Sequence, residues 1–295
     1  TVKAEFPADG SLNYPCLTTL LPAAAWYERE LHDMFGFVPE GHPDLRPLVL
    51  HETFPKGFHP LLKRFNANFQ VRGNREFEMA AANGEGLFEV PVGPIHAGII
   101  EPGAFRFVCN GESVLHLEIA LGYQHRGAEH EFSSTTNRLR QTLLAEGIAG
   151  DSAVSHATAY SSVVEKLAHK PASEALWIER TVALELERMA MHIADTGALS
   201  MDVAYQLGQV ACEALRTMTI NTTQAWCGNR FGKGLIRPYG TNKPLTTEKV
   251  AMIRTNVAEI RRRYNEVVED IKSSPSLLAR FEQCGIVPKA EMQRI

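Results

Sequence analysis

The chain has 295 residues, 44% of them hydrophobic, and a formal net charge of −4 at pH 7. This length allows two domains with an adequate core, and a chain without a long basic run gives no reason to invoke nucleic acid. No apolar run approaches the roughly 20 residues of a membrane span, and five scattered cysteines indicate reduced thiols in a cytosolic compartment.

Residues 1–69 are predicted to form a first, α/β module. Pro22 can open a helix over residues 23–35. A turn rich in Gly, Pro and Asp at 41–44 then precedes the apolar segment 48–50. Four charged residues are predicted to occupy the wetter side of the helix: Glu28, Arg29, Glu30 and Asp33.

Three motifs in this module, WYERELHDMFGF (26–37), GHPDLRPLVL (41–50) and GFHPLLKRF (57–65), resemble the C subunit of NADH:quinone oxidoreductase. The resemblance implies the C-terminal half of a docking module that orients the next domain against a small iron–sulfur subunit. Asp44 and Arg46 are expected on that docking surface. Residues 70–86, which are polar and weakly patterned, are predicted to be a linker.

The third segment, residues 87–295, opens with a predicted β-hairpin. Residues 104–109 and 112–119 are rich in aromatic and branched side chains, and Asn110-Gly111 between them is a strong signal for a tight turn. Gly and Pro punctuate the preceding run, which favours an ordered loop carrying His96 over regular structure.

From about Gly127 onward the chain is predicted to be helical. One helix is expected to end at Gly197, and the next to cover 201–220. Thr246 or Thr247 is a good start for a long helix with an apolar seam from Val250 to Ile271. Two shorter apolar stripes are also predicted, one of Leu139, Leu143, Leu144 and Ile148, the other of Val154, Tyr160, Val163, Val164 and Leu167.

GPIHAGIIEPGAFRF (93–107) and LGYQHRGAE (121–129) resemble the opening of the large-subunit fold shared by nickel–iron hydrogenases and the D subunit of NADH:quinone oxidoreductase. The formate hydrogenlyase and energy-converting hydrogenase branch is the most similar. The resemblance implies an α+β chain: the C-subunit-like fragment, a small β-hairpin region, and a mainly helical bundle of the large-subunit type whose C-terminal part is missing. It also implies membrane-arm partners and a peripheral position on the cytoplasmic face of the inner membrane.

The resemblance argues against a nickel–iron centre in this chain. Such centres sit on two Cys-x-x-Cys pairs, because soft thiolates suit nickel and low-valent iron. Aligned on the segment 156–160, the first pair falls on Ala149-Gly150-Asp151-Ser152, and the second is absent. The chain is therefore expected to hold no cofactor of its own, with the iron–sulfur cluster in a partner subunit. It also has no nucleotide-binding glycine motif, so NADH would bind elsewhere in a complex.

A quinone site is the second expectation from the resemblance. His96 matches the histidine that contacts the quinone headgroup, whereas the tyrosine position falls at or beside Gly150. Tyr123 and Tyr160 are possible substitutes, or core tyrosines, and His96 is equally well explained as a loop-stabilising residue. The residues predicted to converge on the site, with Tyr160 as a further quinone contact, are His96, Arg126, Glu129 and His156.

Three interpretations follow. The chain is a redox-complex subunit that transfers electrons to quinone or a related acceptor only in the assembled complex. Alternatively, it is a non-catalytic scaffold with a relic hydrogenase fold that couples conformational change or docks partners. For His125, Arg126 and Glu129 the resemblance implies a contact near the iron–sulfur partner and a proton path, with His96, Arg126 and Glu129 as the catalytic residues, and a purely structural ion pair is the alternative. The third interpretation is a nickel–iron enzyme whose ligands lie elsewhere.

Overall fold

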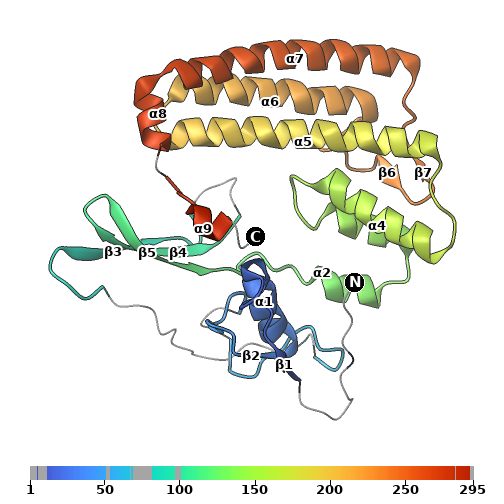
Figure 1. Cartoon of the computed structure of the whole chain (residues 1–295). Helices are drawn as coiled ribbons and strands as arrows, with labels where there is room; N and C mark the ends of the chain where they lie inside the picture. Colours follow the sequence, from blue (N-terminus) through green and yellow to red (C-terminus); the bar gives the residue numbers. More distant parts are fainter. Residues whose placement is uncertain are drawn as a thin grey trace. The chain divides into compact units, whose positions relative to one another are not determined.

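The computed structural model describes residues 5, 12–50, 54–66, 68, 82–96, 101–282 and 284–292. The chain divides into two compact units, Thr1–Gly127 with Val287–Ile295, and Ala128–Ile286 (Figure 1). Helices and short strands occur together, which confirms the α+β class. The boundaries predicted at residues 69 and 86 stay predictions, and the linker lies largely outside the described residues. Among those residues, no helix has both the length and the apolar character to cross a bilayer.

The first unit begins with the short parallel pair β1 (Asn13–Pro15) and β2 (Val38–Glu40). Between them lie a 3-10 turn, Pro22–Ala24, and helix α1 (Ala25–Phe35). Pro22 occupies the first position of the turn, as predicted. Gly36 ends α1 at a positive φ of 81°, a backbone conformation that favours glycine.

The prediction that Glu28 and Asp33 face water is wrong, because both are buried. Glu28 accepts hydrogen bonds from the backbone N–H groups of Leu17 and Thr18, each at 2.9 Å. Burial alone would raise the pKa of Glu28, but hydrogen bonds from Leu17, Thr18 and Cys16 outweigh it and lower the pKa to about 2. Distant backbone donors thus decide where these carboxylates lie.

Asp33 holds the next segment of the chain in the same way. Its Oδ2 accepts the backbone N–H groups of three successive residues, Leu48, Val49 and Leu50, at 2.8, 2.9 and 3.2 Å. Arg29 adds bonds from its guanidinium to the carbonyl oxygens of Arg46 and Pro47. The charged residues of the WYERELHDMFGF motif therefore fasten the following loop onto α1.

The GHPDLR turn makes contacts inside the first unit. Arg46 donates to both oxygens of Asp44 and, from Nη1, to Glu118 at 3.1 Å. The Arg46 guanidinium holds the pKa of Asp44 down at about 2. Both side chains therefore have hydrogen-bond partners within the first unit. The docking role of Asp44 and Arg46 stays a prediction.

The three-stranded antiparallel sheet has the order β3 (Leu87–Val92), β4 (Ala104–Asn110) and β5 (Ser113–Ala120). The predicted hairpin is present, but its turn lies at Gly111-Glu112, because Asn110 pairs with Ser113 after a register shift at Val108/Cys109.

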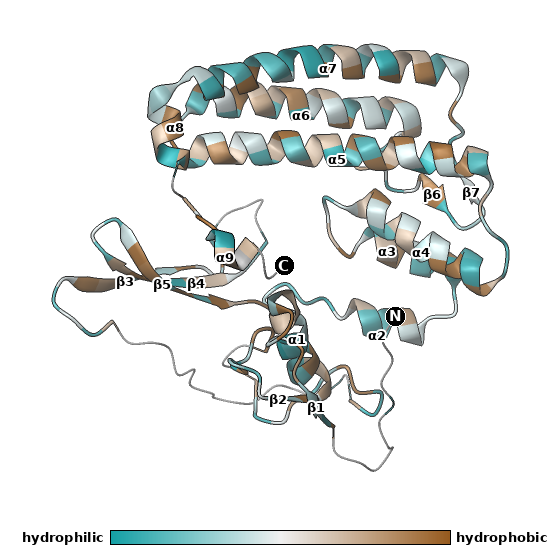
Figure 2. Ribbon diagram, viewed as in Figure 1, coloured by the Kyte–Doolittle hydropathy of each residue, from teal (hydrophilic) through white to brown (hydrophobic). Residues whose placement is uncertain are grey.

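β3 precedes the predicted loop and was not itself predicted. Its alternating Phe88, Val90 and Val92 lie on the face that also carries Phe105 and Phe107 of β4. Hydrophobic residues are prominent in these strands (Figure 2). The opposite face carries the ion pair between Arg106 and Glu89.

The second unit is mainly helical. Helices α5 (Glu174–Asp202), α6 (Gln206–Cys227) and α7 (Thr247–Ser273) lie side by side, with α6 packed against both others (Figure 1). Before them come α2 (Ala128–Ser134), α3 (Arg138–Glu146) and α4 (Ala153–Leu167). The remaining elements are the hairpin β6 (Ile236–Arg237) and β7 (Gly240–Thr241), then α8 (Pro275–Phe281), and α9 (Lys289–Met292), which belongs to the first unit.

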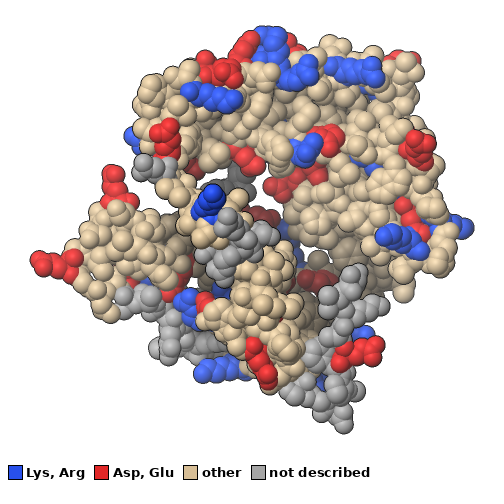
Figure 3. Space-filling view, in the orientation of Figure 1, with Lys and Arg blue, Asp and Glu red and all other residues tan. Residues whose placement is uncertain are grey.

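Helix α7 agrees with its prediction. The Thr246 side chain accepts the N–H of Lys249 as an N-cap, and Ile253 and Ile260 of the seam are buried. Arg262 and Arg263 pair with Glu259 on the exposed side. Basic and acidic side chains accordingly alternate over this helix at the top of Figure 3.

Two predicted helix boundaries are wrong. Helix α5 continues past Gly197 to Asp202, because Gly197 serves close packing: a Cβ there would lie 3.0 Å from Cys212 Cβ of α6. The next helix runs from Gln206 to Cys227 instead of 201–220.

The apolar stripes predicted for α3 and α4 are mostly wrong, because Val154 is the one member of these stripes that belongs to the buried core. Leu139, Leu143, Val163 and Leu167 are all more than half exposed. The buried positions are mostly small or polar, and include two glutamates whose partners are arginines, Glu146 with Arg237 and Glu165 with Arg180. A prediction based on the spacing of large apolar residues does not identify a buried helix face made of small and polar residues.

Candidate functional site

His96 lies in the first unit, in the loop that follows β3. Its ring packs edge-on against Phe105 of β4, with centroids 5.8 Å apart. The His96 Nε2 atom is buried, and it has no hydrogen-bond partner among the residues that the structure describes. Gly93 shapes this loop, because a Cβ there would lie 2.2 Å from the carbonyl oxygen of Gly103.

The predicted convergence of site residues spans both units and stays a prediction. Arg126 belongs to the first unit with His96, and Glu129 lies in the first turn of α2 in the second unit. Both side chains are exposed.

The other two predicted site residues, His156 and Tyr160, lie on α4. His156 Nδ1 contacts the Ser152 carbonyl oxygen at 2.9 Å and its hydroxyl at 3.1 Å. Tyr160 donates its hydroxyl to Gln141 Oε1 of α3 at 2.8 Å, and its ring lies 5.8 Å from that of Phe132 of α2. Tyr160 therefore links three helices in this structure.

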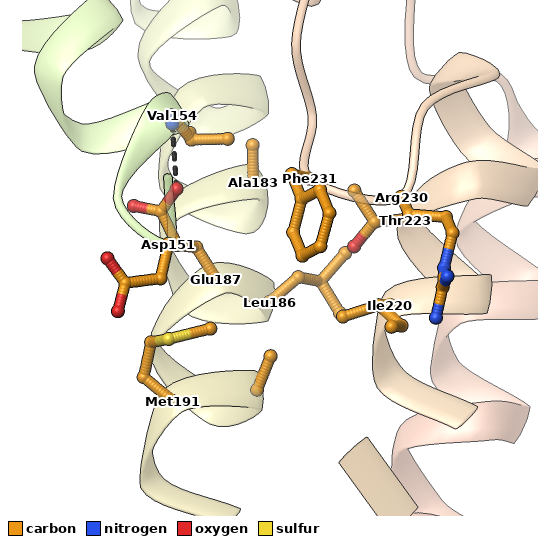
Figure 4. A pocket seen from close by; sticks show the side chains of 11 residues that line it. Asp151, Val154, Ala183, Leu186, Glu187, Met191, Ile220, Thr223, Arg230 and Phe231 are labelled. Atoms are coloured by element: carbon orange, nitrogen blue, oxygen red, sulfur yellow. Dashed lines mark hydrogen bonds between the residues drawn. The ribbon is translucent and has the colours of Figure 1, made fainter. Parts of the chain in front are cut away.

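The N-terminus of α4 is hydrogen-bonded to a carboxylate from α5, Glu187, which was not among the site residues predicted from the sequence. Glu187 of α5 accepts the N–H of Val154 at 2.7 Å (Figure 4). It also accepts the N–H of Ser155, at 3.0 Å. These N–H groups belong to the first turn of α4, where no intrahelical acceptor exists. Asp151 lies on the same side of the neighbouring pocket as Glu187, with Arg230 on the other side (Figure 4).

This pocket is small. Its cavity volume of about 10 Å³ leaves room for about one water molecule. Burial raises the pKa of Glu187, although the Val154 and Ser155 N–H groups and the nearby His156 oppose the rise.

The same turn is where the resemblance places the first pair of metal-binding thiolates. The side chains present are those of Ala149, Asp151 and Ser152, with Glu187 beside them. Oxygen donors of this kind suit hard cations and do not fit a nickel–iron centre. Within the described residues, no cluster of three or more His, Cys, Asp or Glu side chains has the arrangement of a metal site.

Glu187 could have been suspected from its position on α5. It is the neighbour of Leu186 and lies one turn from the buried Ala183 and Ala190. A carboxylate next to an apolar helical stripe signals a partner on another element. That partner, the N-terminus of α4, is visible only in the folded chain.

We expect Glu187→Gln to change how stability depends on pH. Because the folded-state pKa of Glu187 is raised, the neutral carboxyl stabilises the fold fully below the ordinary glutamate pKa of about 4.3, and this stabilisation is lost as pH rises through the folded value. Urea unfolding should show the variant gaining stability relative to the native chain as pH rises. Glu185→Gln, an exposed position on the same helix, is the control. A difference independent of pH would contradict the assignment.

Comparisons with known proteins agree with the resemblance. Residues 1–71 match the family described as respiratory-chain NADH dehydrogenase, 30 Kd subunit. Hydrogenase-4 component G of Escherichia coli (strain K12) is 30% identical over 98% of this chain and 52% of its own length. Formate hydrogenlyase subunit 5 of the same organism is 29% identical over 97% of this chain and 51% of its own length.

A third relative comes from the other branch. The C/D subunit of NADH-quinone oxidoreductase from Nitrosospira multiformis is 26% identical over 94% of this chain and 48% of its own length. The chain thus spans about half the length of the curated relatives it matches. One alignable stretch covers both compact units.

Proposed function

The chain belongs to the family of hydrogenase-4 component G, formate hydrogenlyase subunit 5 and the C/D subunit of NADH-quinone oxidoreductase, and we propose that it works as a subunit of a membrane-associated redox complex. In this proposal it takes part in electron transfer to quinone or a related acceptor. The electrons come from an iron–sulfur cluster in a small partner subunit, and membrane-arm subunits complete the assembly.

The observation that carries the quinone role is the unsatisfied His96 Nε2. A buried ring nitrogen without a partner is costly, and a quinone carbonyl is an acceptor that a neutral histidine N–H can satisfy. Ligand binding would thereby satisfy a ring nitrogen that has no partner within the described part of the chain.

His96→Ala tests this role. The variant should lower quinone-dependent turnover of the assembled complex, because it removes the donor to the carbonyl, while leaving stability nearly unchanged or slightly higher. One neutral hydrogen bond contributes about 0.5–1.5 kcal/mol, so affinity should fall several-fold. His116→Ala is the matched control, since His116 is an exposed residue of the same sheet. Equal turnover in the two variants would refute the role of His96.

The second candidate function is a scaffold that docks partners without redox chemistry of its own. The Tyr160 contacts and the Glu187 cap favour it, because each side chain has a structural task at the predicted site. Quinone titration of the assembled complex separates the two functions. A scaffold would assemble normally, yet neither bind quinone nor respond to His96→Ala.

We expect the purified chain to contain far less than one nickel per molecule, even from a host with working maturation machinery. The reason is the oxygen-donor character of the α4 turn, where a nickel–iron centre needs thiolates. Elemental analysis measures this directly. A content of about one nickel per chain would contradict this prediction and would support the interpretation of the chain as a nickel–iron enzyme.

A further inference from the structure

The turn of the β6–β7 hairpin, which packs against α4, holds a tyrosine in a backbone conformation that favours glycine (Figure 1). Tyr239 has a φ of 66° and follows Pro238 in the two-residue loop between these strands. A turn with Pro at its first central position and positive φ at its second normally carries Gly or Asn there. Among the described residues, two other non-glycine residues have positive φ, but both lie just after a helix end, where this is usual: His169 and Ala204.

Buried charged groups hold the backbone of this turn. Glu165 of α4 accepts the N–H of Tyr239 at 2.8 Å. Arg180 of α5, which also pairs with Glu165, donates to the carbonyl oxygen of Arg237 at 3.1 Å. The Arg237 guanidinium in turn donates to the buried Glu146 of α3 at 2.9 Å. An unfavourable backbone conformation persists only where its surroundings impose it, and such residues cluster at functional sites.

The Tyr239 side chain contributes little to packing. Its ring is 48% exposed. Its hydroxyl forms no hydrogen bond with any residue in the described part of the chain. Burial in the core therefore does not explain why a tyrosine occupies this turn. The buried ion pair instead holds a phenol group whose hydrogen-bonding capacity is unused.

Tyr160, on the neighbouring helix α4, cannot supply the same donor. Gln141 donates from its amide nitrogen to the Thr135 carbonyl oxygen, so its Oε1 atom is the acceptor that takes the Tyr160 hydroxyl proton. Burial raises the pKa of Tyr160, the exposed Arg138 opposes the rise, and Tyr239 adds to it. Tyr239 and Arg138 are therefore both near Tyr160, and this part of the second unit offers a phenol donor together with a cation.

From these observations we propose that Tyr239 is a binding residue for the quinone-type acceptor and donates a hydrogen bond from its hydroxyl to an oxygen of that molecule. A carbonyl oxygen accepts hydrogen bonds but cannot donate them, so a phenol O–H is a suitable partner. The positive charge of Arg138 favours an oxygen that becomes more negative as the acceptor is reduced. The inference rests on the proposed function, because it takes a quinone-type molecule to be the acceptor.

Tyr239→Phe tests the inference, because it keeps the ring and removes only the hydroxyl. Titration of the assembled complex with a short-chain ubiquinone analogue, followed by quenching of protein fluorescence, should show binding weakened about two- to tenfold, the usual loss with one hydrogen bond. KM for the same compound should rise by a similar factor, and the thermal midpoint of the purified chain should stay unchanged. Tyr205→Phe is the matched control, since the Tyr205 hydroxyl also forms no hydrogen bond within the described residues, and it should change neither binding nor KM.

Tyr239→Gly separates backbone strain from binding. Glycine adopts the positive φ without strain, so this variant should raise the thermal midpoint by a few degrees, yet weaken quinone binding at least as much as Tyr239→Phe. A lower midpoint for Tyr239→Gly, or unchanged quinone binding in Tyr239→Phe, would overturn the inference. The proposed function fails separately, if the unaltered complex does not reduce quinone at all.

Discussion

Arg180→Ala should destabilise the helical unit by about 3–5 kcal/mol, the usual consequence of leaving one member of a buried ion pair alone. Arg180 of α5 is fully buried and donates to both oxygens of Glu165 of α4, at 2.9 and 2.5 Å. Burial would raise the pKa of Glu165, but the bonds from Arg180 and the Tyr239 N–H lower it. Urea unfolding of the unit measures the loss.

Two controls separate charge from packing. Arg188→Ala removes an exposed partner of Glu185 on the same helix and should change stability by no more than about 0.5 kcal/mol. The double change Arg180→Met with Glu165→Leu should recover part of the loss, because no charge is then left buried, whereas the Tyr239 N–H and the Arg237 carbonyl oxygen lose their partners. Equal effects of Arg180→Ala and Arg188→Ala would show that the buried pair contributes nothing particular.

Asp33→Ala should destabilise the first unit by about 3 kcal/mol or more, since an unsatisfied buried donor costs about 1–3 kcal/mol and this one carboxylate serves three. Its loss should also free the segment that contacts the end of β5, where the Leu121 N–H donates to the Leu48 carbonyl oxygen. Hydrogen exchange of the Leu48 and Leu50 amides should then accelerate together with the drop in stability.

Glu30→Ala is the matched control for Asp33, because Glu30 is an exposed carboxylate on the same helix. Its effect on stability should stay within about 0.5 kcal/mol. Asp33→Asn, which keeps one acceptor oxygen, should fall between the two alanine variants. If Asp33→Ala leaves amide exchange at Leu48 unchanged, the carboxylate does not hold this segment.

Features with a local cause could be predicted from the sequence. Thr246 caps α7, Pro22 starts the turn before α1, and the Asn110-Gly111 signal lies within one residue of the observed hairpin turn. Each depends on side chains and backbone groups a few residues apart, so short-range chemistry is enough. The family resemblance rests on motifs of the same local kind.

For the candidate site, the sequence identified only part. The loop around His96 follows from its Gly and Pro residues, and the missing thiolates at Ala149 and Ser152 can be read directly. Glu187 was missed because its partners, the N–H groups of Val154 and Ser155, lie more than thirty residues earlier in the chain. A carboxylate that accepts hydrogen bonds from so distant a segment cannot be predicted from the residues around it.

The α+β class, the family and the positions of well-capped elements thus follow from the order of residues. Which charged residues are buried depends instead on how distant segments meet in the folded chain. Glu28, Asp33 and Glu165 occupy the interior because they meet N–H groups or a guanidinium from distant segments, and Gly197 continues its helix because α6 packs against it. A carboxylate is buried when folding supplies its donors, and those donors come from elsewhere in the chain.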